Sequence, residues 1–257
     1  MKALATRLLR SALAAAGLQI RRWPAPLTRR REAELRIDLE HVLAHYLWRH
    51  PRQDFFFVQV GAFDGVANDP LRDLVLAHGW HGILVEPQRE AFRELEKNYG
   101  GRPGLVLRNV AVADVSGPRT LYTLRAGDAG DAELPYWALQ LASFRREVIL
   151  SHRDVIPDID RRIGTETVDC LTFEDLLAPA LPRRIDLLQV DAEGFDFEIL
   201  KLFHGAGLRA RVIGFEHKHL SRPERDACVE HLIALGYRVA LDGPNAVASL
   251  YEGTEPG

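Results

Sequence analysis

One segment, residues 54–86, constrains the fold of this chain more than any other. It reads DFFFVQVGAFDGVANDPLRDLVLAHGWHGILVEP: an apolar run, a turn with two glycines, a short helical pattern and a second apolar run that ends at Glu86. Strand, helix and strand in this order predict two parallel strands joined by a helix. We therefore expect an α/β protein with a mostly parallel sheet.

The same segment has the spacing of a nucleotide pocket. Glu86 follows Gly65 by 21 residues, the distance at which a carboxylate on the second strand reaches the ribose hydroxyls of a ligand held over the first turn. A dinucleotide fingerprint starting at Gly61 requires glycine at positions 63 and 66, but Phe63 and Val66 stand there. The turn therefore disfavours a dinucleotide oxidoreductase and favours a nucleoside ligand without phosphates, such as S-adenosylmethionine.

The rest of the chain continues the alternation of strands and helices. Strand patterns lie at residues 55–60, 82–86, 105–113, 185–191, 211–217, 237–241 and 247–251. Helical patterns lie at 33–49, 70–78 and 88–99, after 191 through 201, and from Ser221, which forms a capping box with Glu224. We predict helices on both faces of the sheet, an antiparallel C-terminal hairpin, and residues 119–124 as a hairpin partner of 105–113.

Two regions are expected: residues 1–50, a basic extension with a packing helix, and residues 51–257, the catalytic domain. Within the latter, residues 125–166 interrupt the alternation and contain Tyr136, Trp137 and Phe144. This stretch is too long for an ordinary connection. We predict that it forms a lid facing the substrate; a surface insertion without ligand contact is the alternative.

Charge is divided unevenly along the chain. Residues 1–31 hold eight of the 33 lysines and arginines and no acid, which leaves 25 basic against 36 acidic residues in the remainder. The acidic body argues against a nucleic-acid substrate. Arg7 and Arg10 interrupt the apolar run that a secretory signal needs, so we expect a cytoplasmic protein. A solvated helix is the simplest interpretation of the extension, and contact with an anionic membrane at its inner face, or with an acidic partner, is the alternative.

Two carboxylates follow the strand at 185–191. Asp191 ends that strand, and Glu193 lies in the turn after it, so both face the crevice at the carboxyl ends of the strands. They could hold the amino group of the ligand, orient an acceptor, remove its proton, or only cap the next helix. A sulfonium loses its positive charge during methyl transfer, so a neighbouring carboxylate stabilises the ground state more than the transition state. We therefore assign Asp191 mainly to positioning the cofactor and acceptor.

Polar residues also follow two other strands. His217 and His219 would point to one face of an extended backbone. One of them could act as a general base, join Asp191 in a metal site, or serve as a structural hydrogen-bonding residue. Two imidazoles without a further run of ligands are a weak metal signal, so we predict no metal. Asn109 and Asp114 could pair with an adenine amino group.

Several stretches in a fixed order resemble the FkbM-type methyltransferases: VGAFDG, ILVEP, NVAVADVSG, VDCLTFEDLL and IDLLQVDAEGFDFEIL. They cover about residues 54–240, and the D-x-E-G sequence after IDLLQV is the most specific part. The resemblance implies a class I, Rossmann-like methyltransferase fold with a seven-stranded sheet and S-adenosylmethionine as cofactor. It also implies O-methylation of a hydroxyl on a sugar, a glycan or a secondary metabolite.

The resemblance further implies roles for the matching residues. Gly61 and Gly65 would line the methionine part, Glu86 the ribose, and Asn109 with Asp114 the adenine, while Asp191 and Glu193 face the transferred methyl. Phe63 and Asp64 in the same turn are further cofactor-binding candidates. Gln59 departs from the pattern, because an acid often stands two residues before the first glycine. Asp64 or Asp191 could supply the missing charge to the cofactor's ammonium group.

The leading prediction is in-line methyl transfer from S-adenosylmethionine to a hydroxyl oxygen, with His217 or Glu193 accepting the proton. The alternative is a non-catalytic cofactor-binding module that docks on a membrane-associated glycan-assembly partner through its basic extension.

Overall fold

The computed structural model describes residues 37–50, 54–125, 134–180 and 182–250, which belong to one compact unit starting at residue 36. The predictions about residues 1–31 fall outside these ranges. Within the ranges, no helix has the length and apolar character needed to span a bilayer.

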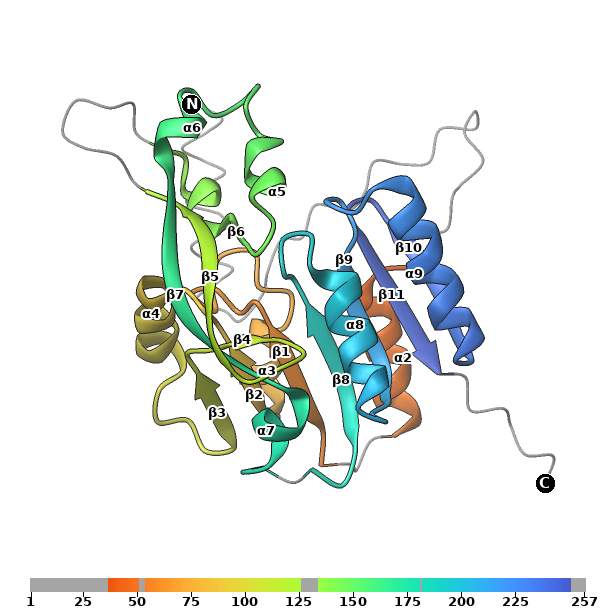
Figure 1. The fold of residues 1–257 in the computed structure, drawn as a ribbon. Coiled ribbons are helices and arrows are strands. Elements are labelled where there is room, and N and C mark those ends of the chain that lie inside the picture. Colours follow the sequence, from red (N-terminus) through yellow and green to blue (C-terminus); the bar gives the residue numbers. More distant parts are fainter. Residues whose placement is uncertain (1–36, 51–53, 126–133, 181, 251–257) are drawn as a thin grey trace, which may run out of the picture. The chain divides into compact units, whose positions relative to one another are not determined.

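A seven-stranded sheet forms the centre of the unit (Figure 1). Its strand order is β10-β11-β9-β8-β1-β2-β3, and all neighbouring pairs from β9 to β3 are parallel. β11 is antiparallel to both β9 and β10. The strands are β1 Phe56–Val60, β2 His81–Val85, β3 Leu105–Arg108, β8 Ile185–Val190, β9 Ala210–Glu216, β10 Tyr237–Asp242 and β11 Asn245–Leu250. The predicted mostly parallel sheet with its antiparallel C-terminal hairpin is confirmed.

Helices cover both faces of this sheet because successive side chains along each strand alternate between two hydrophobic clusters. On β1, Val58 and Val60 pack into the cluster under α7, α8 and α9, whereas Phe57 packs into the cluster under α2, α3 and α4. The helices are α2 Leu39–Arg49, α3 Arg72–His78, α4 Arg89–Tyr99, α7 Phe173–Leu177, α8 Asp196–Gly205 and α9 Arg222–Ala234. Ser221 and Glu224 form the predicted capping box at the start of α9.

The helix α2 is anchored to the sheet by a buried carboxylate. Asp186 of β8 accepts hydrogen bonds from the Tyr46 hydroxyl at 2.7 Å and from the Phe56 amide at 2.9 Å. Leu43 of α2 is buried in the same cluster as the sheet. The helix, which the sequence predicted as a packing helix within residues 33–49, therefore packs on the compact unit.

A second, four-stranded sheet of order β4-β7-β5-β6 stands beside the first (Figure 1). The predicted strand at 105–113 is interrupted at Asn109, and the chain continues as β4 in the second sheet. The predicted hairpin between 105–113 and 119–124 is wrong, because β5 pairs along its full length with β7. The remaining elements are β4 Ala111–Val112, β5 Gly117–Leu124, η1 Tyr136–Gln140, β6 Ala142–Ser143, α5 Arg146–Leu150, α6 Ile159–Arg162 and β7 Ile163–Leu171.

Candidate active site

A cavity of about 620 Å³ opens at the carboxyl ends of β1, β2, β8 and β9. This volume lies within the roughly 300–1,000 Å³ of typical small-molecule sites. Its wall combines the turn after β1, the acids at the ends of β2, β8 and β9, and residues of the 137–144 segment, which contains the end of η1 and the strand β6. Ligands of parallel α/β sheets bind at this end of the strands, so the cavity is the candidate active site.

The turn after β1 fits its neighbours only because it begins with glycine. Gly61 has a φ of +82°, and a Cβ atom on it would lie 1.8 Å from the carbonyl oxygen of Asp191. Its amide donates to the carbonyl of Val85 at 2.9 Å. Gly61 therefore allows the ends of β1, β2 and β8 to meet at the floor of the cavity.

Glu86 is held at the cavity wall by this same turn. Its carboxylate is 3% exposed and accepts the amide of Phe63 at 2.8 Å and that of Gln88 at 2.8 Å. Burial raises the pKa of Glu86 to about 7, although these two hydrogen bonds oppose the shift. Each carboxylate oxygen keeps a second lone pair, so the predicted contact with ribose hydroxyls remains available.

Of the other predicted residues of the turn, one lines the cavity and one stabilises the turn through hydrogen bonds. Phe63 lines the cavity with a φ of +46°. Asp64 does not line it: its carboxylate accepts the amides of Val66 and Ala67 at 2.8 Å and the Tyr136 hydroxyl at 2.6 Å. Burial alone would raise the pKa of Asp64, but these hydrogen bonds lower it.

Gly65 serves packing rather than ligand contact. A Cβ atom there would lie 2.4 Å from the Tyr99 ring and 2.7 Å from Leu95. Its φ of +69° also favours glycine. The residue lies outside the cavity lining and lets α4 approach the turn.

Gln59 lies in the cavity wall beside an acid that the sequence analysis did not single out. The Gln59 amide donates to Asp69 Oδ1 at 3.2 Å, and the Tyr99 hydroxyl donates to Asp69 Oδ2 at 3.2 Å. Asp69 also lines the cavity, and burial raises its pKa against these hydrogen bonds. A carboxylate thus stands next to Gln59. The sequence feature that could have identified Asp69 is the N-D-P sequence just before α3.

The predicted adenine residues lie outside the cavity lining. The Asn109 amide donates to the backbone carbonyls of Glu86 at 2.9 Å and Pro87 at 3.0 Å. Asp114 forms an exposed ion pair with Arg119, which lowers the pKa of Asp114. The placement predicted for Asp114 is corrected: it follows the short strand β4 of the second sheet, whose two residues line the cavity, but Asp114 itself is not among the lining residues.

The D-A-E-G turn brings two acids to the cavity. Asp191, open to the cavity, donates its amide to the carbonyl of Val60 at 2.9 Å. Glu193 has a φ of +45°. The buried carboxylate of Asp196 accepts the amides of Ala192 at 3.2 Å and Gly194 at 3.1 Å, which stabilises this strained turn. Both predicted acids therefore line the cavity.

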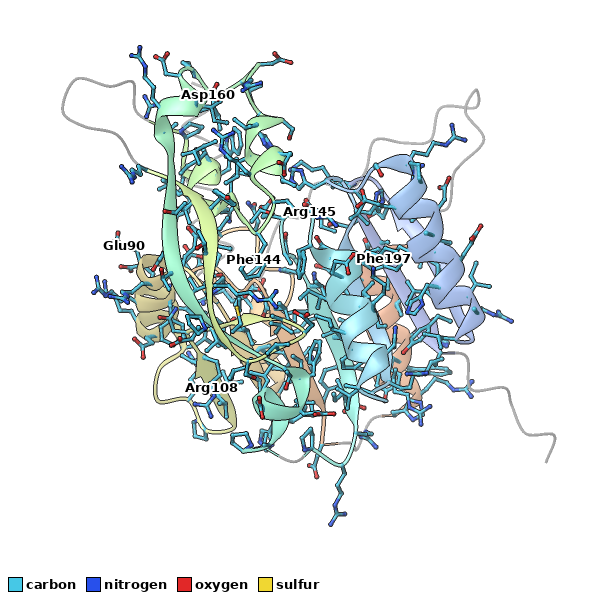
Figure 2. All side chains as sticks on the ribbon, viewed as in Figure 1. Glu90, Arg108, Phe144, Arg145, Asp160 and Phe197 are labelled. Carbon is cyan, nitrogen blue, oxygen red and sulfur yellow. The ribbon has the colours of Figure 1, made fainter. Side chains whose placement is uncertain are left out.

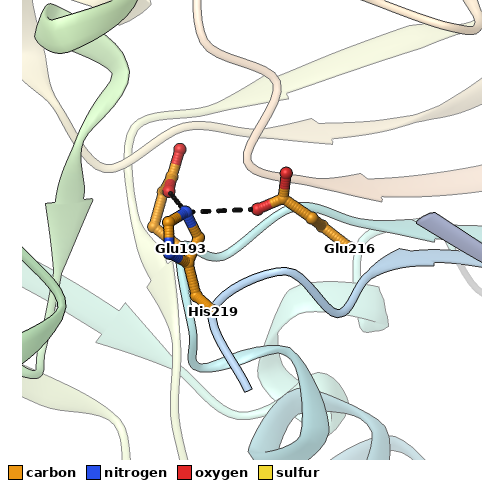
Figure 3. A group of neighbouring side chains, drawn as sticks. All are labelled: Glu193, Glu216 and His219. Carbon is orange, nitrogen blue, oxygen red and sulfur yellow. Dashed lines mark ion pairs between the residues drawn. The ribbon is translucent and has the colours of Figure 1, made fainter. Parts of the chain in front are cut away.

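The two predicted histidines do not share a face. β9 ends at Glu216, and the amide of Leu220 donates to the carbonyl of His217 at 3.1 Å, so a turn replaces the expected extended backbone. His217 lies outside the cavity lining. His219 Nε2 instead lies 2.9 Å from Glu193 Oε2 and 3.5 Å from Glu216 Oε2 (Figure 3). Glu216 lines the cavity and was not predicted.

Burial and mutual repulsion govern the charge of this acidic group. Burial is the main cause that raises the pKa of Asp191, Glu193 and Glu216, and repulsion by neighbouring carboxylates adds to the shift for Asp191 and Glu216. Lys218 opposes it in each case. The acidic side of the cavity therefore favours binding of a cation or a hydrogen-bond donor.

Part of the predicted lid contacts this acidic turn. Ser143 Oγ donates to the backbone carbonyl of Glu193 at 2.8 Å. The ring of Phe144 packs edge-on against Phe195 with a centroid distance of 5.4 Å. Arg145 forms an ion pair of 2.7 Å with Glu224 of α9, and Figure 2 shows Phe144 and Arg145 on the side of the second sheet that faces α8. Residues 137–144 thus form one wall of the cavity.

Comparison with known proteins adds independent information. The profile of the methyltransferase FkbM domain matches residues 59–239. No curated protein matches the chain. The solved structure of methyltransferase FkbM from Methylobacillus flagellatus KT is 11% identical with a TM-score of 0.42 and covers 79% of this chain and 46% of that one, so this chain spans about half its length. The N-terminal domain of human METTL16 in complex with SAH is 14% identical with a TM-score of 0.41, covering 97% and 81%.

Proposed function

The chain belongs to the FkbM methyltransferase family, and from this premise we propose that it methylates a hydroxyl group of a sugar, a glycan or a secondary metabolite. The cofactor is S-adenosylmethionine. The order and directions of the strands are those of the class I methyltransferase fold predicted from the sequence.

One observation carries the proposal. A single cavity has a nucleoside-type wall, with the Gly61 turn and Glu86, and an acidic wall, with Asp191 and Glu193. Methyl transfer needs the methyl donor and the acceptor in one enclosed space, because positioning the two reactants supplies much of the rate. Two walls of different chemistry in one cavity support such a reaction.

The residues of the first wall fit the cofactor. Gly61 lets the turn after β1 pack against the backbone of Asp191 at the cavity floor, since a side chain there would collide with that backbone. Glu86 offers lone pairs to ribose hydroxyls. The buried Oε1 of Gln59 has no hydrogen-bond partner within the described residues. The neighbouring Asp69 offers a negative charge for the ammonium group of the cofactor. In this proposal Asp69 replaces the acid that family members often carry at position 59.

The second wall receives the acceptor. When bound, S-adenosylmethionine supplies an electrophilic methyl group. Asp191 orients the acceptor hydroxyl and accepts its proton at a carboxylate oxygen, a role that the sequence assigned to His217 or Glu193. His217 is outside the cavity lining, and Glu193 already contacts His219. Trp137 and Phe144 offer flat faces against which an acceptor ring can pack.

Incubation with methyl-labelled S-adenosylmethionine and a panel of sugars, glycans and phenolic or polyketide metabolites tests the proposal. We expect label on a hydroxyl oxygen, with demethylated cofactor as the second product, located by mass spectrometry. Asp191→Asn should lose turnover while calorimetry shows cofactor binding retained. Label on nitrogen or carbon, or a fully active Asp191→Asn, would overturn it. Cofactor binding without transfer to any acceptor would favour a non-catalytic module.

A further inference from the structure

Three side chains from the ends of two neighbouring strands converge at the acidic wall: Glu193 after β8, Glu216 as the last residue of β9, and His219 in the turn after β9 (Figure 3). One ligand atom of each lies within 4.8 Å of the other two. Glu193 Oε2 and Glu216 Oε2 lie 2.9 Å and 3.5 Å from His219 Nε2. Two cis ligands, each about 2.1 Å from a divalent ion, are about 3.0 Å apart, so the observed spacing is close to that of a metal site.

The facing atoms form the two ion pairs drawn in Figure 3 when His219 is protonated, but they make no hydrogen bond within the described residues. Within the described part of the chain, Glu193 Oε2, Glu216 Oε2 and His219 Nε2 are buried and have no partner in hydrogen-bonding geometry, despite their short separations. The His219 side chain is only 7% exposed. Buried polar atoms normally have a partner, and three that face one another indicate a shared ligand.

Charge in this group points to a cation. The carboxylates of Asp191, Glu193 and Glu216 all line this side of the cavity, and the nearby Lys218 Nζ is 3.8 Å from the other oxygen of Glu216. One ammonium does not neutralise three carboxylates. A divalent cation among them would balance the charge at the place where the lone pairs converge.

We infer that Glu193, Glu216 and His219 bind a divalent metal ion of the Mn²⁺ type. Two carboxylate oxygens and one imidazole nitrogen are a donor set for first-row divalent ions that also accept oxygen ligands. Three protein ligands leave coordination positions open, and the cavity borders both glutamates. Resting on the proposed O-methylation, the inference places the acceptor hydroxyl oxygen at an open position, where the metal lowers its pKa.

Binding of Mn²⁺ alone tests the site without any substrate. The full chain, freed of metal with a chelator, is titrated with Mn²⁺ while electron paramagnetic resonance measures the free ion. We expect one site in the wild type and at least about tenfold weaker binding in His219→Gln. His217→Gln, which removes an imidazole two positions away, should bind Mn²⁺ as the wild type does. Circular dichroism checks that each variant is folded.

Two outcomes would overturn the inference: no stoichiometric Mn²⁺ site in the wild type, or equal Mn²⁺ affinity in His219→Gln and His217→Gln. If His219→Gln does not fold, Glu216→Gln provides the same comparison through the second ligand. The proposed function is judged separately, because methylation of nitrogen or carbon would refute O-methylation while leaving the Mn²⁺ titration unchanged.

Discussion

Single residues at the cavity floor determine whether the strand ends can meet. Gly61→Ala places a methyl group 1.8 Å from the Asp191 carbonyl oxygen at a φ of +82°. We expect it to lower the free energy of unfolding by more than about 3 kcal/mol, since strain and overpacking add. Gly79→Ala is the matched control, because its φ is +61° and no atom lies within 4 Å of the added Cβ.

Urea unfolding of the two alanine variants separates the cost of backbone strain from the cost of the collision with Asp191. Gly79→Ala should lose only the conformational term of about 1–2 kcal/mol. Equal losses in both variants would show that the contact between Gly61 and Asp191 has no special role in the fold.

Glu86 makes the stability of the cofactor-free protein depend on pH. Burial raises its pKa from 4.5 to about 7. The folded state therefore holds the proton more tightly, so this contribution is full below pH 4.5 and is lost as pH rises through 7. Relative to Glu86→Gln, the unfolding free energy of the wild type should fall by roughly 3 kcal/mol over that interval.

The measurement is urea unfolding at a series of pH values without cofactor, because ribose hydroxyls would favour the charged carboxylate. Glu90→Gln, on the exposed side of α4 (Figure 2), should follow the wild-type profile. Parallel profiles for the wild type and Glu86→Gln would contradict the assigned burial effect.

At the residue scale, the cavity lining includes the predicted residues where one short segment contains both partners. Gly61, Phe63 and Glu86 lie in one strand–helix–strand unit whose spacing determines their placement. Glu216 and His219 meet Glu193 only because β8 and β9 are neighbours and the chain turns after Glu216. The hydrophobic periodicity of the sequence does not reveal that turn.

Among the elements, β6 of the second sheet contributes to the cavity wall that contacts the turn of Glu193. Ser143 is 1% exposed, and its hydroxyl donates to the Glu193 carbonyl. Ser143→Ala leaves that carbonyl without its donor, so we expect a loss of about 1–3 kcal/mol in stability. We also expect a higher KM for the acceptor with an unchanged Kd for the cofactor.

Steady-state kinetics and calorimetry test this division between the two ligands. Ser151→Ala is the control, because its hydroxyl donates to Val148 at 2.6 Å within the same segment. A rise in cofactor Kd with no change in acceptor KM would contradict this prediction, because Ser143 would then support cofactor binding.

Element existence was easier to predict than element pairing. Continuous apolar runs located the strands of the main sheet, because those strands are buried on both faces. The partner of β5 was mistaken, since β7 lies about forty residues further along the chain and the intervening segment shows no clear period. The same segment supplies the cavity wall at 137–144, which only the fold reveals.

For the whole molecule, the strongest feature is the separation of charge along the chain. The first 31 residues have a net charge of +8, whereas the full chain has a net charge of -3. Removing them leaves a body of net charge -11. An anionic surface would repel this body and attract the basic residues, each contributing about 1 kcal/mol near such a surface.

Membrane contact, the alternative to a solvated helix, predicts that the full chain co-sediments with vesicles containing phosphatidylserine and that a chain lacking residues 1–31 remains in solution. The difference should decrease between low and high salt, because screening weakens contacts between exposed charges. Neutral vesicles are the control for apolar binding, which salt does not weaken. Equal partitioning of the two chains at low salt would show that the basic extension does not bind membranes, and would leave an acidic protein partner or a solvated segment as its interpretation.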